Sequence, residues 1–358
     1  MASTPTPAEL GFAMPAEWAR HERTWMAWPT EGYTLGEDPA DAYRAWSQVA
    51  NTIVRYEPVT MVLDPSPAAR ASAGEWLDPA VRRVEQPLND AWMRDIGPTF
   101  LTRGADGSGA DGTRGRELAV ADWTFNGWGA QAWAEWDKDA EIAEAVARES
   151  GARRFVSRMV NEGGGIHVDG EGTVLITETV QLDQGRNPDW TKQQVERELE
   201  AFLGVRKVIW LPRGLTRDYG EFGTRGHVDI VAAFVRPGVV VVHTQPDPTH
   251  PDHEVGRENV ALLRTQTDAK GRTLEVVELP APTILTEADG EPVDYSYINH
   301  YLGNGFALLC GFDDPRDRQA AEILGGLLPD RRIELVDARP VFARGGGIHC
   351  ITQQQPAV

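Results

Sequence analysis

Apolar and polar residues repeat one order along much of the chain: two apolar strands, an amphipathic helix and a third apolar strand. Residues 167–178, HVDGEGTVLITE, have the pattern of a hairpin with a glycine-containing turn. Apolar residues at helical spacing follow over residues 191–203, and residues 205–212 form the next apolar run. Side chains repeat every two residues in strands and every 3.6 in helices, so this order predicts a ββαβ unit.

Two more units of this kind follow. Each contains a hairpin, a helix and a final strand: residues 227–245, 254–267 and 274–280, and then residues 297–312, 316–328 and 333–338. Their hairpins are predicted to turn at Pro237–Gly238 and near Gly303–Gly305, where glycine permits a tight reversal. A last hairpin is predicted to begin at residues 345–350, GGGIHC.

The N-terminal part shows the same signals less regularly. Helical patterns cover residues 40–56 and 134–149, and an apolar run predicts a strand over residues 59–63. The helices recur roughly every 60 residues, and about five units of this size can bury their apolar faces by closing into a ring. We therefore predict an α/β fold that closes radially, with an open α/β sheet as the alternative. Residues 104–116, GADGSGADGTRGR, predict a flexible insertion loop within a single domain of residues 1–358.

Composition narrows the class of protein. The chain has 358 residues, of which 41% are hydrophobic and 25% charged, as in a globular protein. Its net charge of -19 argues against a nucleic-acid partner, because a surface that binds nucleic acid is basic. No apolar run approaches the roughly 18 residues of a membrane span, and the first residues lack the features of a secretory signal. With only two cysteines, Cys310 and Cys350, we expect a cytoplasmic protein without a disulfide framework.

Two of the segments that carry candidate chemistry are glycine runs. The tail contains GGGIHC, which ends in Cys350; because ordering glycines costs backbone entropy, we expect this tail to be folded back into the protein. A second GGGIH begins at Gly163, directly after Glu162. An inert buried thiol is the alternative for Cys350, and a capping role is the alternative for Glu162.

Two further segments carry ionisable side chains. NDAWMRD contains Trp92 and Asp95, and an exposed turn is the alternative interpretation there. In GHVD, strand periodicity predicts His227 and Asp229 on one face and Val228 on the other. An imidazole beside a carboxylate can act as an acid–base and charge-binding pair, although a surface pair would have the same sequence.

Other common chemistries lack their signatures. The chain has no HExxH or CxxC pattern for zinc, no GxSxG elbow and no GxxxxGK[ST] phosphate loop, so we expect no metal and no cofactor. What remains is a thiol, a histidine and several carboxylates. Two carboxylates can hold a planar guanidinium through paired hydrogen bonds, and a thiolate is a strong nucleophile. These residues therefore indicate attack of sulfur on a guanidinium carbon.

The segments NDAWMRDIGP, EGGGIHVDGEGT, GHVD and GGGIHC with the following TQQ together resemble the agmatine deiminase and bacterial peptidyl-arginine deiminase family. This family belongs to the guanidino-group-modifying (pentein) superfamily. The resemblance runs from Met14 to Pro356, and the four motifs in this order are specific where each alone is weak. It implies a five-bladed α/β propeller of ββαβ units around a central active site, which requires no metal or cofactor.

For the chemistry, the resemblance implies that Cys350 is the nucleophile and His227 the general acid and base. Glu162 would hydrogen-bond His227 and help to hold its charge. Asp95 and Asp229 would bind the guanidinium nitrogens. The reaction would convert agmatine and water to N-carbamoylputrescine and ammonia through a covalent thiouronium on the cysteine.

Two more contacts follow from the resemblance, and one segment departs from it. Trp92 would form a wall of the pocket, and Asn299 would help to position the sulfur. Agmatine deiminases generally carry acidic or amide residues just before GHxD, but here the segment LTRDYGEFGTR is longer. Glu221 or Asp218 would meet a substrate ammonium, whereas Arg225 would suit the carboxylate of an arginine-like substrate or would face solvent.

Several alternatives stay open for the activity. They are deimination of another guanidine such as arginine or peptidyl-arginine, amidino transfer to an acceptor amine, and binding of guanidines without catalysis. Silent binding is disfavoured because a binding protein has no need of the thiol. The partner is expected to be a small cationic guanidine, and a homo-oligomer is left open.

Overall fold

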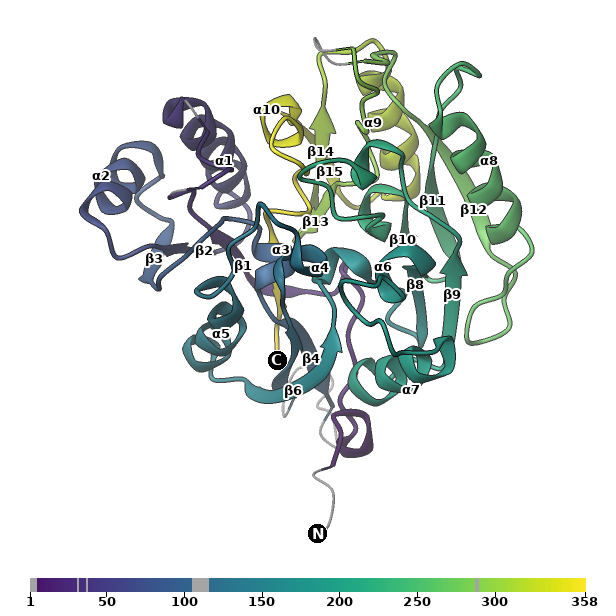
Figure 1. The fold of residues 1–358 in the computed structure, drawn as a ribbon, viewed down its shortest axis with the longest axis horizontal. Coiled ribbons are helices and arrows are strands. Elements are labelled where there is room, and N and C mark those ends of the chain that lie inside the picture. Colours follow the sequence, from purple (N-terminus) through teal and green to yellow (C-terminus); the bar gives the residue numbers. More distant parts are fainter. Residues whose placement is uncertain (1–4, 31, 37, 105–115, 287–289) are drawn as a thin grey trace.

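The computed structural model describes residues 5–30, 32–36, 38–104, 116–286 and 290–358. The strands of this part of the chain form five separate sheets, and Figure 1 shows them around a common centre with helices on the outside. The predicted α/β fold with radial closure is confirmed. Of the predicted insertion at residues 104–116, all but the two end residues lie outside the described residues, so its flexibility stays a prediction.

Four of these five sheets have three strands and one common plan. The first two strands are antiparallel, and a helix then carries the chain to a third strand, which is parallel to the second. In chain order the four units are β4 (Thr99–Arg103), β5 (Glu117–Thr124), α5 (Ile142–Ser150) and β6 (Arg153–Val160); β7 (His167–Val168), β8 (Thr173–Thr177), α7 (Lys192–Leu203) and β9 (Lys207–Leu211); β10 (Ala232–Arg236), β11 (Val239–Thr244), α8 (Asp252–Leu263) and β12 (Glu275–Pro280); and β13 (Tyr301–Gly303), β14 (Phe306–Gly311), α9 (Arg316–Leu327) and β15 (Arg332–Asp337). These are the ββαβ units that the sequence predicts.

The N-terminal and C-terminal strands share the fifth sheet. β16 (Gln353–Pro356) is antiparallel to β1 (His21–Ala27), and β2 (Val59–Leu63) and β3 (Arg82–Glu85) continue the sheet in parallel. Helices α1 (Pro39–Ile53) and α2 (Pro67–Trp76) connect its parallel strands. The partner of the last strand is therefore the first strand, and this pairing closes the ring.

The prediction that the last hairpin begins at residues 345–350 is wrong. The strand begins at Gln353, and the GGGIHC segment before it forms turns. In these turns Thr352 Oγ1 donates to the carbonyl of Ile348 at 3.0 Å, which holds the backbone in a tight bend. The glycine run thus ends in a bend that carries Cys350, rather than in a strand.

The helix predicted from residue 134 also begins later, at Ile142. The carboxylate of Asp139 accepts hydrogen bonds from the backbone N–H groups of Asn89 at 2.8 Å and Asp90 at 3.0 Å, and this contact holds a short turn ahead of the helix. Shorter helices lie in the connections: α3 (Met93–Ile96), α4 (Gly127–Ala130), α6 (Glu178–Gln181) and α10 (Arg339–Phe342).

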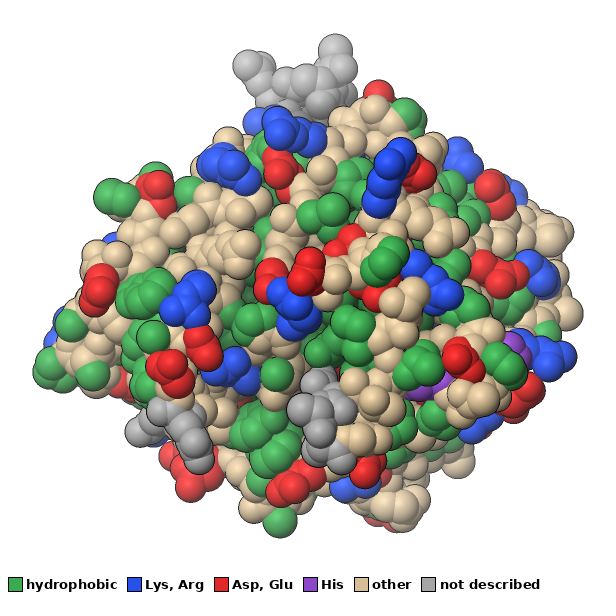
Figure 2. All heavy atoms as spheres, turned by 90° about the horizontal axis from the view of Figure 1, so that it is seen from above, with side chains coloured by type: hydrophobic (Ala, Val, Ile, Leu, Met, Phe, Trp, Pro, Cys, Tyr) green, Lys and Arg blue, Asp and Glu red, His purple; other side chains and the backbone are tan. Residues whose placement is uncertain are grey.

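Apolar side chains fill the space between the sheets and the helices. Trp25, Trp28 and Trp46 are fully buried in one apolar cluster, and burial of each ring stabilises the fold by about 3 kcal/mol. On the face drawn in Figure 2, acidic and basic side chains are interspersed. No helix among the described residues has the length and apolar character needed to cross a membrane.

Closure through β16 makes a testable contribution to stability. Trp25 Nε1 donates to Gln355 Oε1 at 2.9 Å across the β1–β16 pair, and both side chains are buried. Gln355→Ala leaves the indole N–H without this acceptor and should lower the free energy of unfolding by about 1–3 kcal/mol. Gln354→Ala is the matched control, because Gln354 Oε1 has no hydrogen-bond partner among the described residues. Equal losses for the two variants in urea denaturation would contradict this account of closure.

Candidate active site

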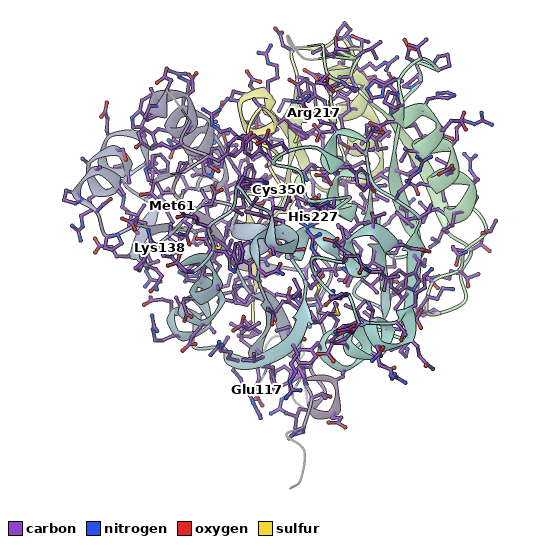
Figure 3. The ribbon with its side chains drawn as sticks, in the orientation of Figure 1. Met61, Glu117, Lys138, Arg217, His227 and Cys350 are labelled. Atoms are coloured by element: carbon purple, nitrogen blue, oxygen red, sulfur yellow. The ribbon has the colours of Figure 1, made fainter. Side chains whose placement is uncertain are left out.

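Turns from different sheets meet at the centre of the ring. Asp95 lies in α3, Glu162 precedes a 3-10 turn over Gly163–Gly165, His227 precedes another over Val228–Ile230, and Cys350 lies just before β16. Figure 3 labels His227 and Cys350 close to the middle of the ring. All four side chains are buried. Closure of the ring therefore gathers the residues that the motifs single out.

GHVD forms a turn, and the prediction of a strand there is wrong. Gly226 has a φ of 110°, and the buried carboxylate of Asp218 accepts hydrogen bonds from the N–H groups of Gly226 at 2.6 Å and His227 at 3.2 Å. Strand β10 begins only at Ala232. Asp218 thus holds the turn, and its carboxylate is already occupied by backbone donors.

The thiol of Cys350 lies between an amide and a carboxylate. Its sulfur is 3.2 Å from Asn299 Nδ2 and 3.5 Å from Asp229 Oδ2. Asn299 is itself held, because its Oδ1 accepts a hydrogen bond from the His349 N–H at 2.9 Å. Burial and the charges of Asp229 and Asp95 raise the pKa of Cys350 well above its ordinary value. Without a bound cation the sulfur is therefore a protonated thiol.

A glycine lies beside both Trp92 and this thiol. A Cβ atom at Gly346 would lie 2.6 Å from the Trp92 ring and 3.1 Å from the Cys350 sulfur, so a larger residue would push the two apart. Trp92 is buried and packs edge-on against Trp46, with 5.7 Å between the ring centroids. Trp92 therefore lies near the thiol, and its role as a pocket wall stays a prediction.

His227 is surrounded by carboxylates. Its Nε2 is 3.2 Å from Glu162 Oε2, and its Nδ1 is 3.9 Å from Asp95 Oδ2. Burial opposes the charge, but Asp95, Glu162 and Asp229 raise the pKa of His227 to about 9. A Cβ atom at Gly164 would lie 2.5 Å from Nδ1, so this glycine leaves room for the ring. His227 is thus an imidazolium at neutral pH and can donate a proton.

Arg186, which no motif marks in the sequence, fixes the charge of Glu162. Its Nε lies 2.9 and 3.0 Å from the two carboxylate oxygens, and its terminal nitrogens donate to Asp183 and to the carbonyl of Thr224. Burial opposes ionisation, but Arg186 and His227 lower the pKa of Glu162 to about 2. Glu162 therefore stays a carboxylate across the physiological pH range.

Asp95 and Asp229 are held by different kinds of donor. Asp95 Oδ2 accepts from Trp128 Nε1 at 2.9 Å, and its Oδ1 accepts from the Gly164 N–H at 3.0 Å; burial raises the Asp95 pKa. Asp229 Oδ2 lies 2.8 Å from His349 Nδ1, and this bond lowers the Asp229 pKa against the effect of burial. Asp229 Oδ1 has no hydrogen-bond partner among the described residues. It is an acceptor that a cationic ligand can use.

Arg225 and Glu221 lie apart from this group of side chains. Arg225 has a φ of 69°, its Nε is 3.9 Å from Asp183 Oδ2, and 43% of its side chain is exposed. Glu221 is exposed in the neighbouring turn. Arg225 thus lies toward Asp183 and solvent, and the substrate contacts expected for Glu221 and Arg225 stay predictions.

A cavity of about 300 Å³ lies next to the site. Its lining includes three aromatic and two acidic side chains: Tyr33, Trp128, Trp133, Asp90 and Glu135. Trp128 connects the cavity to the site, because its ring borders the cavity while its Nε1 binds Asp95. A ligand that reaches from this cavity toward Asp95 would pass along aromatic rings.

A ring of five sheets with a cysteine, a histidine and acids at its centre defines the guanidino-group-modifying enzymes of the pentein fold. The model of the Porphyromonas-type peptidyl-arginine deiminase family matches residues 13–356, and the chain belongs to this family. The family expected from the sequence motifs is thereby confirmed.

Known relatives match nearly the whole chain. A Streptomyces avermitilis protein with the provisional name agmatine deiminase is 61% identical over 355 residues, 98% of this chain and 99% of that protein. Agmatine deiminase of Medicago truncatula is 40% identical over 375 residues, 99% of this chain and 98% of that protein. The solved structure of Enterococcus faecalis agmatine deiminase has a TM-score of 0.89 at 32% identity and covers 99% of both chains. The protein is accordingly a hydrolase that acts on carbon–nitrogen bonds of guanidino compounds.

The pKa of His227 can be measured directly, and we predict how it changes when a neighbouring carboxylate is removed. Glu162→Gln removes a hydrogen-bonded carboxylate and should lower the His227 pKa from about 9 toward its ordinary value of 6.5. NMR of labelled histidine side chains would follow it, and Glu322→Gln, on the exposed side of α9, is the control. The raised pKa of His227 stabilises the wild-type fold fully below pH 6.5, and this stabilisation is lost as the pH rises through about 9. The difference in free energy of unfolding between wild type and Glu162→Gln should therefore shrink between pH 6.5 and about 9. A wild-type His227 that titrates near 6.5 would contradict the assignment.

Proposed function

We propose that the protein hydrolyses agmatine to N-carbamoylputrescine and ammonia. The observation that carries this proposal is the position of Cys350 Sγ, 3.5 Å from Asp229 Oδ2, beside an Asp229 Oδ1 that has no partner among the described residues. The nucleophile and a free carboxylate acceptor therefore lie close together. This is what the reaction requires, because the sulfur attacks the guanidinium carbon while carboxylates bind its nitrogens. The agmatine deiminases of Medicago truncatula and Enterococcus faecalis support agmatine as the substrate.

In this proposal Asp95 and Asp229 bind the guanidinium nitrogens, and Trp92 and Asn299 border the reacting sulfur. The bound cation offsets the carboxylate charges that otherwise raise the Cys350 pKa. Substrate binding thus favours the thiolate at the place where the electrophile has just arrived. The reactive form of the sulfur exists mainly in the complex, which limits its reaction with other electrophiles.

In the first half of the reaction, the sulfur of Cys350 forms a bond to the guanidinium carbon. His227, which is charged at neutral pH, donates a proton to the departing nitrogen as the carbon–nitrogen bond breaks. Ammonia leaves and carries away the proton that the thiol has lost, as ammonium. A covalent thiouronium remains on Cys350, and His227 is now neutral.

In the second half, water attacks the thiouronium carbon. Neutral His227 accepts one proton from this water and so regains its charge beside Glu162 and Asp95. The carbon–sulfur bond breaks, the second proton of the water returns to the sulfur, and the ureido product leaves. Glu162 stays ionised throughout because Arg186 holds it, and so it favours recharging of His227.

The cavity beside Trp128 supports an alkylammonium chain as the far end of the substrate. Asp90 and Glu135 line it, and burial raises the Asp90 pKa to about 6, so a nearby ammonium would favour the ionised form. The carboxylate of arginine would meet these acids, and Arg225 lies toward Asp183; the cations that act on Tyr33 in the lining of this cavity are Arg217 and Arg344. Like charges brought together in this way disfavour arginine by several kcal/mol.

We also infer a cytoplasmic enzyme whose partner is a small cationic guanidine. Cys310 and Cys350 are free and buried, which supports a reducing compartment. The interspersed charges in Figure 2 and the net charge of -19 support the absence of a nucleic-acid partner.

Replacement of Cys350 tests the covalent course. Cys350→Ser should lower ammonia release from agmatine more than ~1000-fold, because the hydroxyl is a far weaker nucleophile, while the unfolding transition stays close to that of wild type. The matched control is Cys310→Ala: Cys310 is buried and its sulfur contacts the backbone carbonyl of Asn299 at 3.1 Å, and this variant should keep most of its activity. A Cys350→Ser enzyme that kept about a tenth of wild-type turnover would contradict the mechanism.

A panel of guanidines tests the choice of substrate. Agmatine should exceed arginine and a C-terminal arginyl peptide in kcat/KM by roughly 100-fold, as expected from a carboxylate placed against acids. Asp90→Asn should raise KM for agmatine and narrow its advantage over arginine. Equal turnover of arginine and agmatine, measured by ammonia and ureido product, would exclude agmatine as the preferred substrate.

A further inference from the structure

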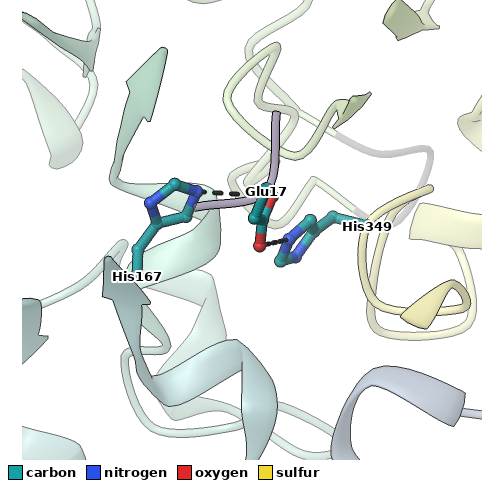
Figure 4. Close-up of side chains that lie close together, drawn as sticks. All are labelled: Glu17, His167 and His349. Carbon is teal, nitrogen blue, oxygen red and sulfur yellow. Dashed lines mark hydrogen bonds and ion pairs between the residues drawn. The ribbon is translucent and has the colours of Figure 1, made fainter. Parts of the chain in front are cut away.

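The two GGGIH segments bring their histidines to one buried carboxylate, Glu17. Figure 4 shows Glu17 between His167 and His349. His349 Nε2 is 2.8 Å from Glu17 Oε1, and His167 Nε2 is 3.5 Å from Glu17 Oε2. All three side chains are buried, and the chemistry proposed above uses none of them. Their convergence therefore needs an explanation of its own.

The ring nitrogens indicate hydrogen bonds at this cluster and argue against a set of metal ligands. His167 Nδ1 accepts from the Phe234 N–H at 3.2 Å, so its Nε2 carries the proton and faces Glu17. His349 has a carboxylate oxygen 2.8 Å from each ring nitrogen, so both nitrogens donate. A metal ion would need a lone pair on each ring. Arg94 Nη1, 3.5 Å from Glu17, adds a positive charge that also opposes a cation there.

His349 connects this cluster to the active site. Its Nδ1 bonds to Asp229 Oδ2, the oxygen that lies 3.5 Å from Cys350 Sγ. Arg94 holds the same segment from the other side, because its Nε donates to the His349 carbonyl at 3.2 Å and its backbone N–H donates to the Cys350 carbonyl at 3.0 Å. The bond from His349 therefore decides which oxygen of Asp229 stays free for a ligand.

We propose that His349 and Glu17 are positioning residues that keep the Asp229 carboxylate ionised and its Oδ1 free for the guanidinium. Glu17 anchors the far side of the His349 ring and stabilises its charge, and His349 donates to Asp229. His167 and Arg94 hold Glu17 in place. These roles rest on the proposed function, in which Asp229 binds the guanidinium.

The charges along this row of side chains agree with the geometry. Burial opposes ionisation of Glu17 and Asp229, but His349 lowers the pKa of both. Burial and Arg94 oppose protonation of His349, yet Glu17 and Asp229 raise its pKa. Besides His349, the charged and titratable groups that act on Asp229 or are acted on by it include His227, Arg94, Cys350, Cys310 and Asp95. Loss of the His349 charge would leave Asp229 buried near another acid, and its pKa would rise.

Two substitutions in the full-length protein test these roles. His349→Asn keeps a short donor near Asp229 but loses the charge and the reach to Glu17, and Glu17→Gln removes a charge at nearly constant shape. In a Cys350→Ser background, each should weaken agmatine binding about tenfold in calorimetry. In the active enzyme, each should raise KM more than it lowers kcat. In the pH profile of kcat/KM, the acidic limb should move to higher pH by about one unit, because Asp229 then protonates more readily.

Controls separate these positioning roles from loss of the fold. His253→Asn makes the same chemical change on the peripheral helix α8 and should leave the acidic limb in place, while Glu17→Asp keeps the charge and should restore part of the affinity. If His349→Asn does not fold, His167→Gln, which perturbs Glu17 only through a 3.5 Å contact, should give a smaller shift of the same sign.

Three outcomes are decisive. A wild-type enzyme that does not turn over agmatine would overturn the proposed function itself. An active wild type, with folded variants whose agmatine affinity and acidic limb are unchanged, would overturn only the roles of His349 and Glu17. Wild-type activity that EDTA abolishes and zinc restores would show a metal site in place of the hydrogen-bonded cluster.

Discussion

Carboxylates buried at the centre of the ring are the constraint on which the rest of this structure depends. Removing a carboxylate from water costs several kcal/mol unless cations or hydrogen-bond donors replace the water. Arg186 provides this for Glu162 and His349 for Asp229, whereas Asp95 accepts hydrogen bonds from the neutral donors Trp128 and Gly164 and has its nearest cation, His227, 3.9 Å away. The remaining negative charge is what a guanidinium compensates. Recognition of the substrate and activation of the thiol are therefore one electrostatic event.

The fold serves this arrangement by placing turns, and not strands, at the centre. His227 and Cys350 each lie in a turn directly before a structured segment, and glycines beside them allow approaches that a Cβ atom would block. Cys350 also precedes β16, the strand that closes the ring against β1. The pairing that completes the architecture thus fixes the position of the sulfur, so stability of the closure and placement of the nucleophile are linked.

The sequence predicted those parts of the site that lie in compact motifs. Cys350, His227, Glu162 and Asp95 stand beside glycines or tryptophan, and the ring closure followed from the repeated order of strands and helices. Arg186 and Glu17 could not be found this way, because each meets its partner only through tertiary contact and no local pattern marks it. The strand predicted at GHVD failed for a similar reason: the period of two fits His227 and Asp229, but Asp218 bonds to the backbone there and holds a turn.

A crystal structure of the Cys350→Ser protein with agmatine would test the central claim most directly. We expect the guanidinium nitrogens to lie about 3 Å from carboxylate oxygens of Asp95 and of Asp229, with Asp229 using Oδ1 while Oδ2 stays bonded to His349. The guanidinium carbon should face residue 350, and the ammonium should lie in the cavity beside Asp90. A guanidinium bound away from Asp95 and Asp229, or an Asp229 turned away from His349 to meet it, would contradict the account.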